Sequence, residues 1–307
     1  MVRSSLFVLS CSLLLSPGIQ AESVLKTEQL AENVYALLGP TGNRDPRNLG
    51  NNANFGVIVT EAGVVLIDPG GSYRGAQMIH ESVRGITDRP IAMVINTGGQ
   101  DHRWLGNGYF KALGARIIAN DHAVRDQKAR LQDELFRLGS LIGNEGMAGT
   151  KPAYADETFA ERKVIDMGGV RIEIYHAGHA HTPGDSYVWL PEQKIIFSGD
   201  IVYMDRMLNV GPQSAHRSWI VAFEAMASRQ PAVIVAGHGA PSDLARATAD
   251  TYDYLIFLRN AVLAFMDAGN GMEDVGEIDQ SRFRYLENYD SLKGQNAQRV
   301  FEELEWE

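Results

Sequence analysis

Histidine and aspartate side chains that could bind a metal ion stand at the ends of apolar segments of this chain. Residues 92–95 form one such segment, and after a short polar stretch it is followed by Asp101 and His102. Apolar and β-branched residues in such a run favour a strand covered on both faces, and the Gly-Gly pair after it favours a sharp loop. Because carboxylate oxygen and imidazole nitrogen both bind zinc, the adjacent pair predicts two ligands of one ion. A loop aspartate bonded to its neighbours is the simpler alternative for these two residues taken alone.

Three later segments repeat the pattern and favour the metal site. Residues 178–186 read Gly-His-Ala-His-Thr-Pro-Gly-Asp-Ser, residues 197–200 read Phe-Ser-Gly-Asp, and residues 233–239 end on Gly-His-Gly. In layered α/β folds such strand ends meet at one edge of the sheets. The candidate ligands from the four segments are Asp101, His102, His181, Asp200 and His238.

The four motifs, in this order, resemble those of the metallo-β-lactamase fold superfamily, and the resemblance covers nearly the whole chain after its first residues. It implies an α/β fold, a four-layer αββα sandwich of two mixed β-sheets flanked by helices. It also implies that Asp101, His102 and His238 hold the second metal of the family's site. Asp200 matches the carboxylate that bridges two metals, and His181 matches the third histidine of the first metal position.

The loop before Asp101 departs from the family pattern. Where the family has two histidines, this chain has Gly98, Gly99 and Gln100, and the loop is one residue shorter. Glycine has no side-chain ligand, and an amide oxygen suits zinc poorly. We therefore expect one tight zinc ion, with a second uncertain. Gln100 or His179 could replace a missing ligand, and iron or manganese would also suit the donor set.

An open zinc site predicts hydrolysis. The resemblance implies a metal-bound hydroxide that attacks an ester, thioester, amide or lactam carbonyl of a small-molecule substrate. With one metal, a general base is needed, and Asp101, His181 and Asp200 are the catalytic candidates. Because the histidines of the first metal position are replaced, β-lactamase activity is possible but less expected. Asp68, after an apolar run, is expected to support the metal loop from behind.

The sequence of the central loop, Asn-Thr-Gly-Gly-Gln-Asp-His-Arg-Trp-Leu-Gly-Asn, resembles that of a periplasmic branch of the superfamily called quinoprotein relay system zinc metallohydrolases. This resemblance implies a link to a quinoprotein dehydrogenase pathway. It leaves an alternative to hydrolysis: a non-hydrolytic accessory protein of that pathway that binds a metal or a small metabolite.

Residues 1–21 have the build of a signal peptide, with Arg3, an apolar run and a small residue at Ala21. The apolar run is too short to span a bilayer, so we expect a periplasmic protein with no membrane attachment after cleavage. The single cysteine, Cys11, lies in that segment, which excludes disulfides and thiolate ligands from the rest. A formal net charge of −10 argues against nucleic acid as a partner.

Residues 22–307 are expected to form one hydrolase domain, without linkers or repeats. A helix or irregular lead-in is expected from residue 22, before a strand at residues 34–38. Two strand-rich halves follow, at residues 55–119 and 164–198. A helix is expected from His122 to Leu138, and the glycines between residues 139 and 149 predict a loop after it.

Overall fold

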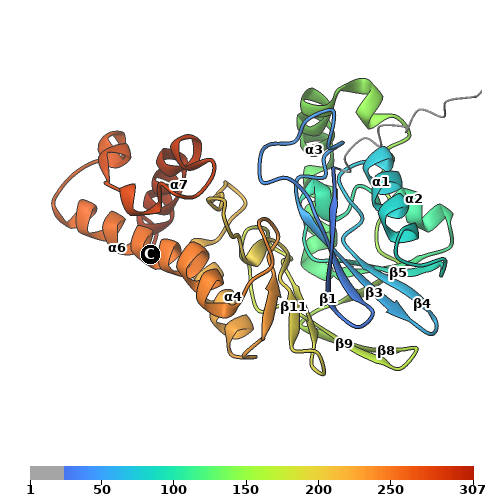
Figure 1. Cartoon of the computed structure of the whole chain (residues 1–307). Coiled ribbons are helices and arrows are strands. Elements are labelled where there is room, and N and C mark those ends of the chain that lie inside the picture. Colours follow the sequence, from blue (N-terminus) through green and yellow to red (C-terminus); the bar gives the residue numbers. More distant parts are fainter. Residues whose placement is uncertain (1–23) are drawn as a thin grey trace, which may run out of the picture.

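Two β-sheets pack face to face in the computed structural model, which describes residues 24–307, and helices lie on their outer sides (Figure 1). This arrangement confirms the four-layer αββα fold. The predicted signal peptide at residues 1–21 lies outside the described residues. Along the part of the chain that is described, no helix combines the length and apolar character needed to cross a bilayer.

The first sheet has its strands in sequence order. Its first four strands are antiparallel, and from β4 onward neighbouring strands run parallel. Parallel neighbours require helical crossovers, and these cover the outer face of this sheet. The strands are β1 (Lys26–Ala31), β2 (Val34–Leu38), β3 (Asn54–Thr60), β4 (Gly63–Ile67), β5 (Ile91–Asn96), β6 (Arg116–Asn120) and β7 (Glu157–Phe159).

The second sheet has the order β12-β11-β10-β9-β8. All its neighbours are antiparallel except β11 and β12, which are parallel. The carboxyl end of β12 therefore lies beside the carboxyl end of β11. The strands are β8 (Arg162–Met167), β9 (Val170–Tyr175), β10 (Tyr187–Leu190), β11 (Ile195–Phe197) and β12 (Val233–Val235).

The helices divide between the two outer faces. Side chains of α1 and α2 share an apolar cluster with the first sheet, and those of α4, α6 and α7 share another with the second sheet. One turn of π-helix, Thr248–Tyr252, joins α5 to α6. The helices are α1 (Tyr73–Arg84), α2 (Asn107–Ala112), α3 (Asp121–Met147), α4 (His216–Ala227), α5 (Leu244–Ala247), α6 (Asp253–Asp267) and α7 (Tyr289–Leu304).

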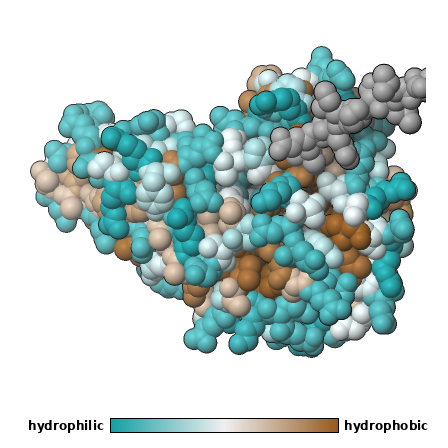
Figure 2. Space-filling model, viewed as in Figure 1, coloured by the Kyte–Doolittle hydropathy of each residue, from teal (hydrophilic) through white to brown (hydrophobic). Residues whose placement is uncertain are grey.

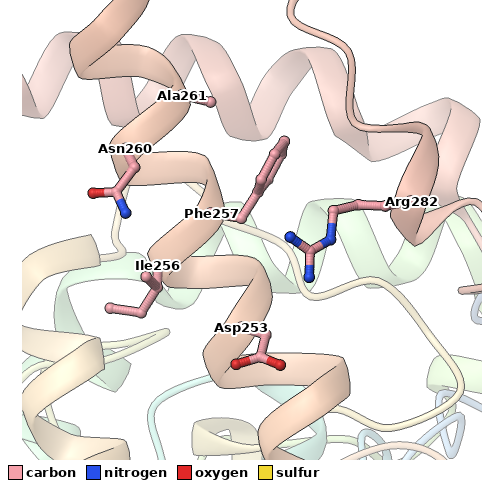
Figure 3. Close-up of a pocket in the computed structure, with 6 residues that line it drawn as sticks. All are labelled: Asp253, Ile256, Phe257, Asn260, Ala261 and Arg282. Carbon is pink, nitrogen blue, oxygen red and sulfur yellow. The ribbon is translucent and has the colours of Figure 1, made fainter.

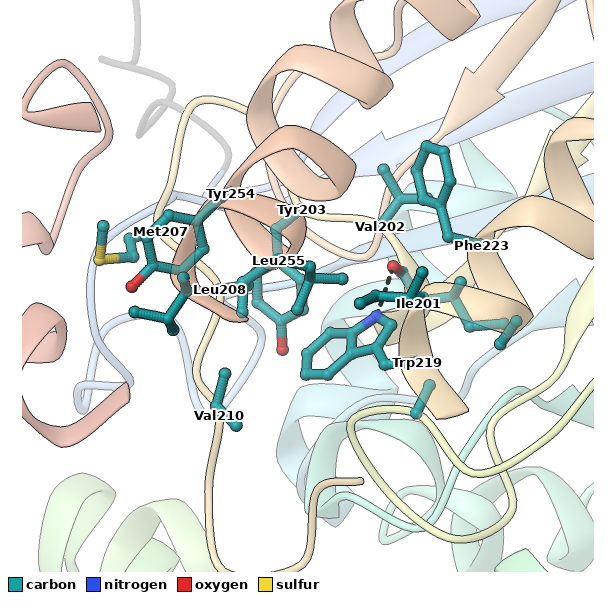
Figure 4. Close-up of a cluster of buried hydrophobic side chains, with 14 of the residues drawn as sticks. Ile201, Val202, Tyr203, Met207, Leu208, Val210, Trp219, Phe223, Tyr254 and Leu255 are labelled. Atoms are coloured by element: carbon teal, nitrogen blue, oxygen red, sulfur yellow. Dashed lines mark hydrogen bonds between the residues drawn. The ribbon is translucent and has the colours of Figure 1, made fainter. Parts of the chain in front are cut away.

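A third apolar cluster fills the space between the sheets, where Ile58 and Ile95 of one sheet meet Ile174 and Phe197 of the other. The cluster under α4, α6 and α7 is anchored by Trp219, whose Nε1 donates to the carbonyl oxygen of Ile201 at 2.9 Å (Figure 4). Because Ile201 follows Asp200 directly, this hydrogen bond fixes the backbone next to a candidate ligand. Most of the surface shown in Figure 2 is hydrophilic, and its apolar residues are scattered in separate patches.

Two sequence-based expectations were wrong. The lead-in at residue 22 is neither helical nor irregular, because Lys26–Ala31 forms strand β1, which pairs with β2. The loop predicted between residues 139 and 149 is instead the last part of α3. The chain breaks helical geometry there only at Gly143, with φ 73°, and the helix resumes. Leu138 and Ile142 hold this part in place by packing with Trp104.

Candidate metal centre

The strand ends bring three of the predicted ligands together. His102 follows β5, Asp200 follows β11 and His238 follows β12. All three are buried, and one potential ligand atom of each lies within 4.8 Å of those of the others. Nε2 of His102 is 3.2 Å from Oδ2 of Asp200, and Nε2 of His238 is 3.4 Å from Oδ1. Two imidazoles and one carboxylate match the three-ligand sets of catalytic zinc sites, which keep a further position open.

The surroundings of the two imidazole rings suit His102, Asp200 and His238 to binding a metal ion. Nδ1 of His238 donates to the carbonyl oxygen of Asn52 at 2.8 Å, whereas Nδ1 of His102 lies 2.9 Å from Oδ1 of Asp101 and 2.6 Å from Nη2 of Arg44. The acceptor at Nδ1 of His238 favours the tautomer whose Nε2 carries a lone pair, as in metal-bound histidines. Nε2 of His102 is also buried without a hydrogen-bond partner. The three residues therefore fit one metal ion.

Neighbouring residues fix both histidine rings. The ring of Tyr203 stacks on that of His238, with centroids 4.8 Å apart and an angle of 22° between the planes. The rings of His102 and His238 meet edge to face at 5.4 Å. Tyr203 is buried in the same apolar cluster as Trp219 (Figure 4). The core of the second sheet thus restricts the orientation of His238 directly.

Arg103 connects the strand ends through buried hydrogen bonds. Its guanidinium makes two hydrogen bonds to Asp200, at 2.7 and 3.2 Å, and one to Asp68 at 2.8 Å. It also donates to the carbonyl oxygens of Asn54 and Gly237. Burial would raise the pKa of Asp200, but Arg103, His102 and His238 together outweigh it and hold that pKa well below its usual value. Asp200 is therefore charged and can serve as a metal ligand.

Asp68 takes the supporting position that the sequence predicts. Its Oδ1 accepts a hydrogen bond from the backbone N–H of Thr97 at 2.7 Å, and its Oδ2 accepts from the Thr97 hydroxyl at 2.7 Å. Thr97 begins the loop that leads to Asp101 and His102. Asp68 thus fixes the start of the metal loop without joining the three-residue cluster.

Asp101 lies on the Nδ1 side of the His102 ring. Its Oδ1 accepts a hydrogen bond from Nη2 of Arg44 at 2.6 Å and faces Nδ1 of His102. Burial would raise its pKa, but Arg44 and His102 lower it below the usual value. The sequence assigned Asp101 as a direct ligand. In this structure its carboxylate orients the ring of His102 and stands outside the cluster of three.

His181 also stands outside that cluster. Its Nδ1 donates to the carbonyl oxygen of Asn209 at 2.9 Å, and its Nε2 is 2.8 Å from Oε1 of Gln100. Burial lowers the pKa of His181 to about 4, so the ring is neutral at neutral pH. His179, the proposed substitute ligand, instead contacts the carbonyl oxygen of Gln213. Neither Gln100 nor His179 joins the three-residue cluster.

A polar cavity of about 430 Å³ opens beside Asp101. Guanidinium, carboxylate and amide groups dominate its wall, which is built from the 40s loop, the metal loop, α3, the 209–213 segment and α7. The lining includes Arg44, Gln100, Asp101, Arg130, Glu134 and Asn209. Another hollow, about 480 Å³, lies on α6 between Asp253, Phe257 and Arg282 (Figure 3). None of the predicted site residues lines that second hollow.

Several residues of the site were missed by sequence reasoning. Arg103 directly follows the Asp-His pair, but its role depends on Asp68 and Asp200, which are distant in sequence. Arg44 lies in a segment rich in Asn, Gly and Arg, whose sequence does not indicate that its side chain reaches Asp101. Arg130 and Glu134 lie on α3, where charged residues usually face solvent, so the sequence carried no signal for them.

Comparison with known proteins identifies the family. The Metallo-beta-lactamase superfamily model matches residues 49–238. Metallo-beta-lactamase type 2 of Elizabethkingia meningoseptica is 25% identical over 218 residues, covering 70% of this chain and 78% of the relative. Metallo-beta-lactamase type 2 of Bacillus sp. (strain 170) is 25% identical over 191 residues, covering 61% of this chain and 66% of the relative.

Solved structures agree on the fold. A metallo-beta-lactamase from Pontibacter korlensis has a TM-score of 0.61 at 20% identity, covering 76% of this chain and 99% of its own. A double mutant of the sec-alkyl sulfatase PisA1 has a TM-score of 0.70 at 16% identity, covering 91% of this chain and 50% of its own. Because the family model spans more than half of the sequence and includes His102, Asp200 and His238, this chain belongs to the metallo-beta-lactamase superfamily.

Proposed function

We propose that this protein is a hydrolase that works with one tightly bound metal ion, zinc being the best match, held by His102, Asp200 and His238. The observation that carries the proposal is the paired histidine geometry. Both Nε2 atoms face Asp200, and Nδ1 of His238 donates to a backbone carbonyl oxygen. The contact of the buried Nε2 of His102 with Asp200, at 3.2 Å, does not have the geometry of a hydrogen bond, which a site built only for structural hydrogen bonding would provide.

When bound, such an ion supplies Lewis acidity, which polarises a carbonyl group and makes a water molecule more acidic. The protein must then supply a proton acceptor. Of the three candidates, Asp101 lines the cavity, whereas both oxygens of Asp200 accept hydrogen bonds from Arg103. We assign Asp101 as the proton acceptor on this ground. His181 is neutral and donates from Nδ1 to the carbonyl oxygen of Asn209, so its Nε2 can only accept, from the side-chain amide of Gln100 at the cavity wall.

The substrate class follows from the cavity. Its volume of about 430 Å³ suits a small molecule, and its lining offers charged and amide groups in place of aromatic surface. We propose a polar ester, thioester, amide or lactam as the substrate, bound in this cavity. β-Lactams belong to this class and are tested with the others.

The cellular setting is a proposal that rests on the sequence alone. The leader at residues 1–21 supports export to the periplasm, and the central loop supports a role beside a quinoprotein dehydrogenase. No feature of the described residues favours the non-hydrolytic alternative over hydrolysis.

The test combines metal content with turnover. Protein purified from the periplasm without chelators is analysed by elemental mass spectrometry, together with His238→Ala and, as the matched control, His122→Ala. His122 is an exposed histidine on α3. We expect about one metal ion per chain in the wild type and in His122→Ala, and a loss of metal in His238→Ala, because two donors hold zinc more weakly than three.

The same samples are then assayed on chromogenic esters, thioesters, amides and lactams. Turnover that depends on the metal and disappears in His238→Ala supports the proposal. A wild-type protein that carries its metal but hydrolyses none of these classes contradicts it and favours a binding role.

A further inference from the structure

The first metal position implied by the family is filled by protein. A Cβ atom built on Gly98 would lie 2.6 Å from Oδ1 of Asp185, well inside van der Waals contact. A Cβ atom on Gly99 would overlap Oδ2 of Asp126 even more severely. The two carboxylates therefore occupy the space into which side chains at positions 98 and 99 would project. The residues present do not fit a metal ion there.

The guanidinium group of Arg130 forms an ion pair with one of these carboxylates, that of Asp126. Arg130 binds Asp126 with two parallel hydrogen bonds, one of them 2.7 Å from Nε to Oδ1, and its Nη1 donates to Oε1 of Glu134 at 2.6 Å. Glu134 in turn accepts from Nε1 of Trp104 at 3.1 Å. These contacts hold the cation in one orientation, and a guanidinium has five N–H donors in a fixed plane.

Arg130 stands beside the residues that would have faced the first metal. It lines the same cavity as Gln100 and Asp101, and Gln100 touches Nε2 of His181.

We propose that Arg130 takes the place of the first metal ion, so that a guanidinium fixed by Asp126 and Glu134 supplies the second positive charge of the site. Its three bonds to these carboxylates use three of its five N–H groups. The other two are available to the carbonyl oxygen of a substrate in the cavity. As water adds to the carbonyl carbon, one of its protons passes to Asp101 and the π electron pair moves onto that oxygen, where Arg130 stabilises the negative charge. The pair then re-forms the carbonyl as the bond to the leaving group breaks, and the leaving group takes the proton. This catalytic step rests on the proposed hydrolytic function, whereas the replacement of the metal does not.

The replacement is tested by counting metal ions. Wild type, Arg130→Ala and Arg125→Ala are dialysed to equilibrium against increasing zinc and analysed by elemental mass spectrometry. Arg125 is an exposed arginine on the same helix and serves as the matched control. We expect wild type and Arg125→Ala to saturate at one ion per chain. Arg130→Ala should take up a second ion, because the carboxylates of Asp126 and Glu134 are left without their cation.

Two ions per chain in the wild type would overturn the proposal, and so would an Arg130→Ala protein that binds no more zinc than the wild type. If Arg130→Ala does not fold, as judged by circular dichroism, Arg130→Lys replaces it. Lysine keeps the charge without the planar fork. It should therefore bind a single ion, and a second ion in this variant would contradict the proposal.

The catalytic step is tested separately with p-nitrophenyl acetate. Arg130→Ala should lose about 100- to 1,000-fold in kcat, the effect of removing one oxyanion donor, with a smaller change in KM. Arg130→Lys should be intermediate, and added guanidinium ion should restore part of the activity of Arg130→Ala. Unchanged kcat in Arg130→Ala refutes the catalytic role. A wild type inactive on esters, thioesters, amides and lactams alike contradicts the hydrolase proposal instead, while the zinc count still decides the replacement of the metal.

Discussion

Arg103 is the residue on which the geometry of the site depends most. It is buried with both of its carboxylate partners, Asp68 and Asp200. Removing one partner of a buried ion pair leaves uncompensated charge, which costs about 3–5 kcal/mol. We therefore predict that Arg103→Met lowers the free energy of unfolding by about this amount, measured by urea denaturation. Arg116→Met, which breaks a more exposed pair with Glu157, should cost less than about 1 kcal/mol. Equal losses in the two variants would show that Arg103 is not a central support.

Asp185 gives a prediction for pH. Burial and the charge of Asp200 raise the pKa of Asp185 to about 8, from an ordinary value of 3.8. Between these two values the folded chain holds a proton that the unfolded chain has lost. The free energy of unfolding therefore falls as the pH rises from about 4 to about 8, by at most about 1.4 kcal/mol per pH unit.

Asp185→Asn removes this titration, because an amide stays neutral. Urea denaturation at several pH values should show wild type losing stability relative to Asp185→Asn as the pH rises through this window. Asp166→Asn, at an exposed position, is the control. If wild type and Asp185→Asn keep a constant difference across the window, Asp185 does not hold its proton in the folded state.

At this scale the sequence predicted the ligands better than their supports. His102, Asp200 and His238 are recognisable because each follows an apolar run that ends at the same edge of the sheets. The partners of Arg103 cannot be read in this way, because which carboxylate it meets depends on how three strand ends come together. Asp101 could be recognised as part of the site, but not as the residue behind His102.

Among the elements, α3 differs most from its prediction. The glycines after Leu138 favour a loop, yet the helix continues to Met147 because Leu138 and Ile142 are buried against Trp104 and Leu105. Tertiary packing here outweighs local preference. The helix matters for function, since α3 carries Arg130 and Glu134 to the cavity, and its extension adds Leu141 to the cavity wall. Strand β1 is a similar case, because pairing with β2 makes a strand of a polar segment.

The contact between α3 and the metal loop can be tested at Gly99. A methyl group at this position would overlap the carboxylate of Asp126. Overpacking of this kind costs about 1–3 kcal/mol, so Gly99→Ala should lower the free energy of unfolding by that amount. Gly294→Ala is the control, because its Cβ would meet nothing within 4 Å and alanine favours the helix α7. A Gly99→Ala protein as stable as this control would mean that α3 and the loop are not in close contact.

For the whole molecule, one metal site should influence global stability, because its three ligands come from both sheets. A ligand that binds only the folded state stabilises it by about 2.7 kcal/mol at a concentration of a hundred times its Kd. Zinc should therefore raise Tm by about 5 °C or more over chelator-treated protein in calorimetry. His238→Ala should show a much smaller shift. A full shift in that variant would place the stabilising ion elsewhere.

The overall fold could be predicted from the sequence better than single elements or the contacts of the site. Alternating strands and helices, with ligand types at the strand ends, led to two mixed sheets flanked by helices, and this is the observed fold. The C-terminal region was less predictable. Helix α7 follows a segment with little apolar periodicity, yet Val300 and Phe301 complete the cluster under the second sheet. The helix also lines the cavity through Gln295, beyond the residues that the family model matches.

The filled space beside Gly98 and Gly99 also bears on how this site can evolve. To regain the family's first metal position with its histidine ligands, the chain would need two histidines and an added loop residue as well as the removal of Arg130. Each histidine introduced alone would collide with a carboxylate that is already in place. Removing Arg130 alone would leave Asp126 and Glu134 without their ion pair. Every single step is therefore deleterious, and the loss of the first position behaves as a one-way change that later mutations, taken singly, do not reverse.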